Sequence, residues 1–165
     1  MAIVDLHAKN PTADGRQSER ALLVRRGVQY LMKHMRNASI SEMTLRNGRR
    51  ADLICLTEKG EIWIIEIKSS IEDFRVDTKW PEYRDYCDRL FFATHAGVPL
   101  DIFPEDCGLL LADRYGAEVI RPAPEHRLPP ARRKLLTLAF ARNAAERLTS
   151  AELVLERLEA EGVTF

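Results

Sequence analysis

Two stretches of sequence decide the fold, RRADLICL at residues 49–56 and EIWIIEIK at residues 61–68. Each is dominated by β-branched and other apolar residues, which predicts buried strands at residues 51–56 and 62–68. The short connection between them suits an antiparallel hairpin in which Gly60 adopts a positive φ. The core of the protein is therefore expected to include a β-hairpin.

This hairpin brings three ionisable side chains together. A register that pairs Leu56 with Ile62 also pairs Asp52 with Glu66, and facing residues in an antiparallel pair have Cβ atoms about 5 Å apart. Because side chains alternate along a strand, Glu66 and Lys68 point the same way. Two carboxylates at that distance repel each other, so a compensating cation is expected. Lys68 supplies one positive charge, and a divalent metal would supply more.

The donor atoms of this cluster suit a hard metal ion. Carboxylate oxygens with open water positions are typical of Mg²⁺ or Mn²⁺ bound beside a substrate phosphate. Such a metal would polarise the scissile phosphate and lower the pKa of an attacking water. Lys68 would orient that water or stabilise charge on the phosphorane. The plainer interpretation is that Glu66 and Lys68 form a surface ion pair, but their apolar neighbours and Asp52 on the preceding strand weigh against it.

Helical and strand-like patterns continue on both sides of the hairpin. Apolar residues recur at helical spacing for about 18 residues from Ser18, which is a plausible N-cap. The order of elements predicts an α/β fold with a mixed β-sheet flanked by helices. The further elements expected are a short strand at 39–45, a helical turn at 71–76, a helix from Pro81 to 88, buried strands at 89–94 and 108–112, an edge strand at 117–121, a proline-rich loop at 121–130, a helix from Ala131, and a last helix beginning at the capping box of 149–152.

The length suits one domain. We interpret residues 1–17 as a flexible N-terminal leader and residues 18–165 as a single domain. The chain contains 25 basic and 25 acidic residues, and this balance argues against a protein that coats nucleic acid by charge alone. It remains compatible with a nuclease, because an acidic metal site offsets basic patches elsewhere.

The sequence also predicts the cellular location of the protein. No run of about 18 apolar residues occurs, so no membrane span is expected. The first residues lack the basic region and apolar stretch of a secretory signal. Three widely spaced cysteines, Cys55, Cys87 and Cys107, predict reduced thiols packed as small apolar residues. A cytoplasmic location is therefore expected.

Basic and aromatic residues near the hairpin offer contacts for DNA. Arg46, Arg49 and Arg50 flank a glycine turn beside Asp52 and could hold phosphates, or they could be the charges of a solvated turn. Arg132 and Arg133 open a helix, where cations are unfavourable to the helix dipole. That position suggests an anionic partner, although solvated charge is the simpler interpretation.

An aromatic face follows the hairpin. Trp80, Tyr83 and Tyr86 share one side of the helix that begins near Pro81. They could stack on an unpaired base, but packing against the sheet is the favoured interpretation.

Together these residues resemble a known family. Asp52 followed by Glu66-Ile67-Lys68 is similar to the signature of PD-(D/E)XK phosphodiesterases, with Ala51 in place of the proline that usually precedes the aspartate. A closer resemblance, over roughly residues 18–148, is to the MmcB-like DNA repair family. The strings that carry it are NGRRAD (47–52), EIKSS (66–70), DF (73–74), KWPEYRDYCD (79–88) and ADRYGAE (112–118).

The resemblance implies a restriction-endonuclease-like fold and a metal-dependent nuclease site in bacterial DNA repair. Its catalytic residues would be Asp52, Glu66 and Lys68, and the carbonyl of Ile67 would be an additional metal ligand. An acidic residue from the first helix often completes such sites. Here Glu19 opens that helix and Glu42 precedes the strand of Asp52, and either could complete the site. The alternatives are a favourable first-turn charge for Glu19 and an exposed strand residue for Glu42. Asp77 and Lys79 could contact the site from the segment after Lys68, and Lys79 is also expected to contact DNA.

Two functional hypotheses follow. The first is a Mg²⁺- or Mn²⁺-dependent deoxyribonuclease acting on damaged or branched DNA. The second is a non-catalytic module that keeps the fold and binds DNA or a repair protein. The intact set of Asp52, Glu66 and Lys68 favours the enzyme, and the zero net charge favours the module. Action on RNA stays open, as does the choice between endonuclease and exonuclease. The sequence contains no legible dimer interface, although a dimer is possible.

Overall fold

The computed structural model describes residues 18–163 of the chain. These residues fall into two units, one that extends to Leu128 and one that begins at Pro129. The proposed leader, residues 1–17, lies outside the described residues. The single domain over residues 18–165 stays a prediction.

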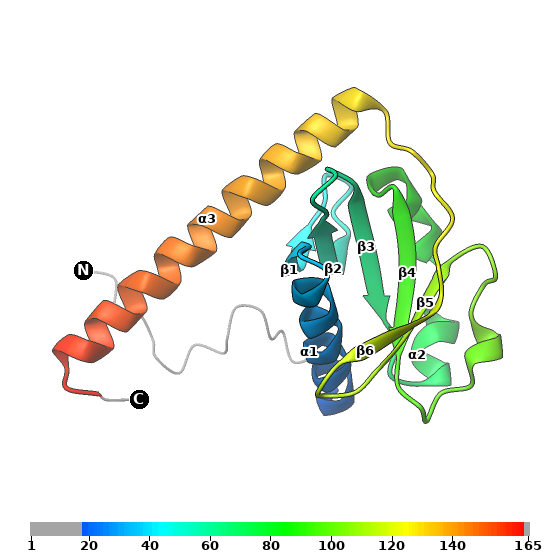
Figure 1. The fold of residues 1–165 in the computed structure, drawn as a ribbon, viewed down its shortest axis with the longest axis horizontal. Helices are drawn as coiled ribbons and strands as arrows, with labels where there is room; N and C mark the ends of the chain where they lie inside the picture. Colours follow the sequence, from blue (N-terminus) through cyan, green and yellow to red (C-terminus); the bar gives the residue numbers. More distant parts are fainter. Residues whose placement is uncertain (1–17, 164–165) are drawn as a thin grey trace. The chain divides into compact units, whose positions relative to one another are not determined.

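The first unit is built around a mixed sheet, in which the described residues form six strands in sequence order (Figure 1). The β1–β2, β2–β3 and β5–β6 pairs are antiparallel, whereas β3–β4 and β4–β5 are parallel. The expected α/β class and the edge position of the last strand are confirmed. The strands are β1 (Ala38–Thr44), β2 (Arg50–Leu56), β3 (Ile62–Ile67), β4 (Arg89–Thr94), β5 (Gly108–Ala112) and β6 (Ala117–Arg121).

The hairpin register that the sequence predicts is present. Leu56 pairs with Ile62, and the ladder continues to Leu53 opposite Ile65. Gly60 in the connecting turn has a φ of 80°, a conformation that glycine adopts without steric cost. Side chains on both faces of β3 are buried, so the short turn at Gly60, and not burial of one face, sets this register.

Helices cover both faces of this sheet. Helix α1 (Glu19–His34) packs on one face through Val24, Val28 and Met32, against side chains such as Leu53 and Ile65. Ser18 is its N-cap as expected, since the hydroxyl accepts a hydrogen bond from the N–H of Ala21 at 3.2 Å. Val24 and Val28 are almost completely buried, so burial of this apolar stripe holds the helix on the sheet.

The opposite face is covered by the segments that connect the parallel strands. These are α2 (Ile71–Val76) and the 3₁₀ helix η1 (Trp80–Tyr86) between β3 and β4, and η2 (Leu100–Ile102) between β4 and β5. Phe92 of β4 is their shared contact, with ring centroids 5.4 Å from Phe74, 5.3 Å from Trp80 and 5.4 Å from Phe103. Because side chains alternate along β3, Glu66 points towards this face and away from α1.

Parallel pairing also fixes where the strands end. The carboxyl ends of β3, β4 and β5 meet at one edge of the sheet, where they lead into Lys68, His95 and Asp113. In open α/β sheets this edge is where ligands usually bind.

The second unit contains one long helix among the described residues, α3 (Pro130–Ala160). The expected break at residues 149–152 is wrong, because α3 runs through the capping-box sequence without interruption. The hydroxyl of Ser150 donates to the carbonyl of Glu146 at 2.8 Å, inside the helix, instead of capping a new one. Strong helix formers surround this serine and no glycine or proline interrupts them, so helix continuation wins.

Two smaller expectations can also be compared with the structure. Cys55, Cys87 and Cys107 are free thiols, and all three are buried. Within residues 18–163, none of the helices has both the length and the apolar character needed to cross a bilayer.

Candidate active site

The carboxylates of Asp52 and Glu66 meet where β2 and β3 cease to pair. The Oδ2 atom of Asp52 accepts a hydrogen bond from the N–H of Ile67 at 2.8 Å, and Oε1 of Glu66 accepts one from the N–H of Asp52 at 3.2 Å. These two bonds follow the last backbone pair, Leu53 with Ile65. Side-chain oxygens thus take over from carbonyl groups beyond the ladder, which fixes the position of each carboxylate.

Glu66 is strongly perturbed by this environment. It is 3% exposed. Burial, followed by the negative charge of Asp52, raises the pKa of Glu66 well above its usual value. Lys68 acts in the opposite direction but does not cancel these effects. The site therefore carries an excess of negative potential, and a bound cation would relieve it.

Lys68 is buried beside this pair and held by Asp77. Its Nζ donates to Oδ2 of Asp77 at 2.6 Å, so the contact expected from the segment after Lys68 is present. Burial acts to lower the pKa of Lys68, but the charges of Glu66 and Asp77 outweigh it and hold that pKa above its usual value. The lysine stays charged at neutral pH.

The backbone around Lys68 is equally fixed. Its N–H donates to the carbonyl of Ala93 at 2.9 Å. Its own carbonyl accepts a hydrogen bond from the buried hydroxyl of Thr94 at 2.7 Å. Both partners belong to β4, so the neighbouring parallel strand holds the lysine in position after β3 ends.

Among the described residues, the two acidic residues proposed to complete the site do not form a metal-binding cluster with Asp52 and Glu66. Glu19 is exposed in the first turn of α1. Glu42 is buried on β1 with a φ of 52°, and its Oε2 lies 4.0 Å from the guanidinium of Arg25 on α1. Within residues 18–163, no three His, Cys, Asp or Glu side chains gather closely enough to hold a metal ion. Asp52 and Glu66 are thus brought together without Glu19 or Glu42.

Some of the proposed DNA contacts line a common hollow. Arg49, Arg50 and Lys79 border a polar depression of about 610 Å³, together with Tyr83. Arg49 also makes a two-pronged ion pair with Glu82 of η1, at 2.9 and 3.3 Å. This ion pair joins the glycine turn before β2 to the segment that follows Lys68.

The other proposed DNA contacts lie outside this hollow. Arg46 is exposed in the same turn as Arg49 and does not belong to the lining. Arg132 and Arg133 lie in the first turn of α3, in the second unit.

Trp80 and Tyr83 of η1 pack against the rest of the protein, in agreement with the favoured interpretation of the aromatic face. Trp80 meets Phe92 edge to face, and Tyr83 is 6% exposed. The hydroxyl of Tyr83 donates to the carbonyl of Arg50 at 2.9 Å. Burial and the charges of Glu66 and Asp52 raise the pKa of Tyr83 above its usual value, so it remains a proton donor at the floor of the polar hollow.

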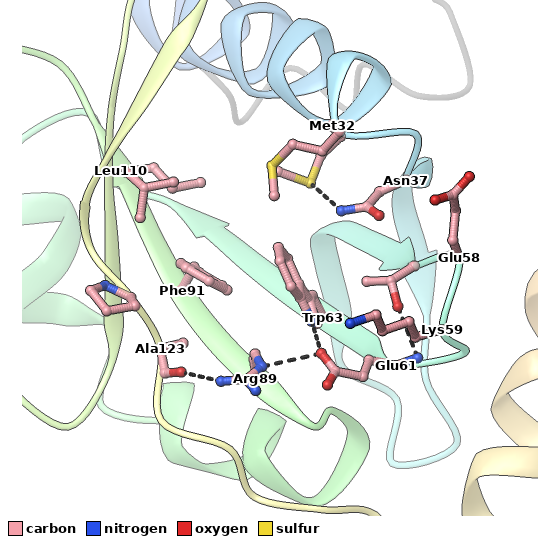
Figure 2. Close-up of a pocket in the computed structure, with 14 residues that line it drawn as sticks. Met32, Asn37, Glu58, Lys59, Glu61, Trp63, Arg89, Phe91, Leu110 and Ala123 are labelled. Carbon is pink, nitrogen blue, oxygen red and sulfur yellow. Dashed lines mark hydrogen bonds and ion pairs between the residues drawn. The ribbon is translucent and has the colours of Figure 1, made fainter.

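A second hollow, of about 510 Å³, opens near the other end of β3 (Figure 2). Trp63 and Phe91 lie together in it, with ring centroids 5.1 Å apart. Its main polar groups pair with one another: Glu61 accepts from both Trp63 and Arg89, and Arg89 also donates to the carbonyl of Ala123. These contacts secure the loop that follows β6 and suggest no chemistry.

Several contacts between distant segments were not predicted from sequence patterns. Asp88 is fully buried, and its two oxygens accept from the N–H groups of Ile62 and Leu128. Ser18 donates to the hydroxyl of Ser69 at 3.1 Å, and Nε2 of His95 lies 3.0 Å from the carbonyl of Ser69. These contacts join segments distant in sequence, so no local pattern could reveal them.

The fold and the site together define a mixed α/β protein with two carboxylates and a lysine gathered at the end of its central hairpin. The family model for DNA repair protein MmcB-like matches residues 8–154. The chain therefore belongs to the MmcB-like DNA repair family. Among curated proteins, none matches it significantly.

A solved structure is also similar. It is the SPO1766 protein of unknown function from Silicibacter pomeroyi, which shares 42% sequence identity with a TM-score of 0.78. The match covers 82% of this chain and 93% of that one. The similarity supports the fold of this chain and indicates no activity, because the function of the SPO1766 protein is unknown.

Proposed function

We propose that this chain is a metal-dependent deoxyribonuclease of the PD-(D/E)XK type, with a restriction-endonuclease-like fold, that acts in bacterial DNA repair. The observation that carries the proposal is the reciprocal anchoring of Asp52 and Glu66 beside the buried Lys68. Family membership supports the repair context. A cytoplasmic location follows from the proposal, because bacterial DNA lies there.

The residues present fit a hard divalent cation. Glu66 is buried next to a second carboxylate, and burial, followed by the charge of Asp52, raises its pKa; a cation would offset both effects. Mg²⁺ is commonly held by one or two carboxylates together with substrate phosphate, so a third acidic side chain is not required. Asp52, Glu66 and the carbonyl of Ile67 would hold the ion. A bound Mg²⁺ or Mn²⁺ supplies polarisation of the phosphate and a more acidic water.

The protein's own side chains would do the remaining work. Lys68, charged and held by Asp77, would donate to the attacking water or to a non-bridging oxygen of the phosphate. Arg49, Arg50 and Lys79 would contact phosphates of the DNA strand from the polar hollow. Guanidinium groups suit this role because they form paired hydrogen bonds with phosphate oxygens.

A cleavage assay tests the proposal. Labelled duplex, flapped, forked and single-stranded DNA, with RNA beside them, are incubated with Mg²⁺ or Mn²⁺ and either the wild type or Lys68→Ala. Metal-dependent cutting should be lost in Lys68→Ala and retained in Lys59→Ala. Lys59 is a matched control because it is an exposed lysine in the turn at the opposite end of β3. Cutting by Lys68→Ala at the wild-type rate would exclude the assignment.

A second candidate function is a non-catalytic module that binds DNA or a repair partner. The observation that favours it is the lack of a cluster of three metal-ligating side chains among residues 18–163. Metal affinity discriminates between the two functions. Calorimetric titration with Mn²⁺ should show binding to the wild type and a loss of at least about tenfold in Asp52→Asn if the enzyme proposal holds. Equal, weak binding by both proteins would favour the module.

A further inference from the structure

A hollow lies at the edge of the sheet that carries Lys68. It measures about 640 Å³ and lies between the start of α1 and the segments that follow β4 and β5. Much of the lining is apolar, including Leu23, Val24 and Leu111. A volume of this size is typical of sites for small ligands and would accept a nucleotide.

The charged residues of the lining are balanced in sign. Arg20 and Arg114 are basic, whereas Asp113 and Glu118 are acidic. The carboxylate of Asp113 is used within its own turn, where it accepts hydrogen bonds from the N–H groups of Tyr115 and Gly116 at 2.7 and 3.1 Å. A hollow with apolar walls and balanced charge is better suited to a flat, uncharged ring, such as a nucleobase, than to a phosphate group.

The turn between β5 and β6 presents an unusual pair of side chains to this hollow. Tyr115 is 74% exposed, more than Tyr30 at 54%. The guanidinium of Arg114 lies 4.7 Å from the centre of the Tyr115 ring, as in a cation–π contact. The pair forms an exposed, flat platform that includes an aromatic ring.

The backbone beneath this platform is rigid. The N–H of Asp113 donates to the carbonyl of Gly116 at 3.0 Å and closes the turn. The turn packs directly on α1 at Gly27, where even a Cβ atom would overlap the carbonyl oxygens of Asp113 and Gly116. A fixed backbone loses little conformational entropy when it binds a ligand, so the turn that carries Tyr115 is preorganised.

The hollow lies at the same edge of the sheet as Lys68, on the side that carries α1. β3 and β5 end at the same edge with only β4 between them, a lateral separation of two strand spacings or about 10 Å. His95, part of the lining, contacts the carbonyl of Ser69, which directly follows Lys68. A DNA strand that reaches Lys68 can therefore extend into the hollow.

Resting on the nuclease function proposed above, we infer that this hollow holds one unpaired nucleotide of the bound DNA strand, with its base stacked on Tyr115. Stacking on an aromatic ring tolerates any base, because every base has a π-face. A paired base cannot present that face. The substrate is therefore DNA with a single-stranded segment next to the cleavage site, such as a fork, a flap or an overhang.

Binding without cleavage tests this inference separately from catalysis. Fluorescence anisotropy in EDTA compares a labelled single strand, a fork and a blunt duplex. Tyr115→Ala should weaken binding to the single strand and the fork about tenfold or more, and change duplex binding less than about twofold. Tyr115→Phe keeps the ring and should bind as the wild type does. Tyr30→Ala is the matched control, because Tyr30 is a 54% exposed tyrosine on α1 that does not line the hollow.

A second readout reports the stacking itself. With 2-aminopurine placed at successive positions of the unpaired strand, the wild type should quench its fluorescence at one position. Tyr115→Ala should remove that quenching, and the Tyr30→Ala control should keep it. This signal depends on contact between base and ring, so a general loss of stability in the variant would not reproduce it.

The outcomes separate the two proposals. If Tyr115→Ala loses affinity for single-stranded and forked DNA but not for duplex, the inference is supported. This holds even if the wild type cleaves no substrate and the nuclease proposal fails. Wild-type binding by Tyr115→Ala overturns the inference, while metal-dependent cleavage in the separate assay would still support the nuclease. The inference is also overturned if Tyr115→Ala binds single strand and duplex more weakly by the same factor, because Tyr115 would then not distinguish unpaired from paired bases. No binding of any DNA by the wild type overturns it as well.

Discussion

The carboxylate of Glu66 on β3 accepts a hydrogen bond from the backbone N–H of Asp52 on β2, at 3.2 Å. Asp52 in turn accepts one from the N–H of Ile67, the residue after Glu66. Each carboxylate is thus fixed by the backbone of the strand that carries the other. This arrangement holds two acidic groups together in a buried place, where their charges disfavour each other. This electrostatic cost is better explained by a site that binds a cation than by a contribution of the two carboxylates to folding.

Replacing Glu66 by glutamine should stabilise the metal-free protein at neutral pH. The pKa of Glu66 is raised in the folded state, so its contribution to stability is present below the usual carboxyl pKa and is lost as the pH rises towards the folded value. Glutamine keeps an oxygen for the N–H of Asp52 and carries no charge. The gain should be on the order of 1 kcal/mol, or about 3 °C in Tm, and should vanish in acid. Denaturant unfolding at several pH values measures it.

Glu61 provides the matched control on the same hairpin. Burial acts to raise its pKa, but hydrogen bonds from Trp63 and Arg89 outweigh burial and hold that pKa below its usual value. Its stabilising contribution is therefore present above the usual carboxyl pKa and is lost as the pH falls. Glu61→Gln should destabilise the protein at neutral pH and lose that effect in acid, the reverse of Glu66→Gln. The same sign for both variants would contradict the electrostatic account.

Asp77 should act as a positioning residue for Lys68. Its carboxylate lies 2.6 Å from Nζ and helps to raise the pKa of the lysine. In Asp77→Asn that pKa should fall, so the alkaline limb of the pH profile of kcat/KM should move to lower pH. We expect kcat to decrease by up to about a hundredfold, with little change in KM. Asp77→Glu should restore part of the rate. A rate loss without any movement of the pH profile would point to a structural role instead.

Much of the hairpin could be predicted from sequence, because a short turn limits how two apolar strands can pair and successive side chains take opposite faces. That pattern gave the register, and the register brought Asp52 opposite Glu66. The edge position of β6 was accessible in the same way, since its residues are only partly apolar. Sequence reasoning succeeded here because the two strands are adjacent in the chain and joined by a short turn.

Other features depend on contacts between distant segments. The partner of Lys68 is Asp77, and only the path of the chain through α2 brings it there. The positive φ of Glu42 is adopted by a residue that seldom takes it, so no sequence rule would place its carboxylate beside Arg25. The capping box in α3 matched a real motif, but the surrounding helix formers outweighed it. A capping-box motif shows that a helix could begin at a residue, and the surrounding sequence and packing decide whether it does.

Asp88 should be one of the most sensitive positions for stability. It is 0% exposed, and its oxygens accept from Ile62 at 2.8 Å and from Leu128 at 2.9 Å. Asp88→Ala leaves two buried N–H groups without an acceptor, which should cost about 3 kcal/mol or more. Asp88→Asn keeps one acceptor oxygen and should cost less. Thermal unfolding measures both, with the exposed Asp85→Ala as control. A Tm for Asp88→Ala within a degree of the control would be inconsistent with this role.

Gly27 should resist replacement by alanine although it lies inside a helix. Helix propensity alone predicts that Gly27→Ala gains about 1 kcal/mol. The added Cβ would overlap the carbonyl oxygens of Asp113 and Gly116, which belong to a closed turn and cannot rotate away. We therefore expect a net loss of about 1–3 kcal/mol, seen as a lower Tm. Gly116→Ala is the control, because a Cβ there meets no described atom within 4 Å. If helix α1 positions the turn for DNA, Gly27→Ala should also weaken single-strand binding under native conditions, whereas Tyr30→Ala on the same helix should not. A stabilised Gly27→Ala protein with unchanged binding would show that the turn is free to move, and the rigid platform would then no longer explain the exposure of Tyr115.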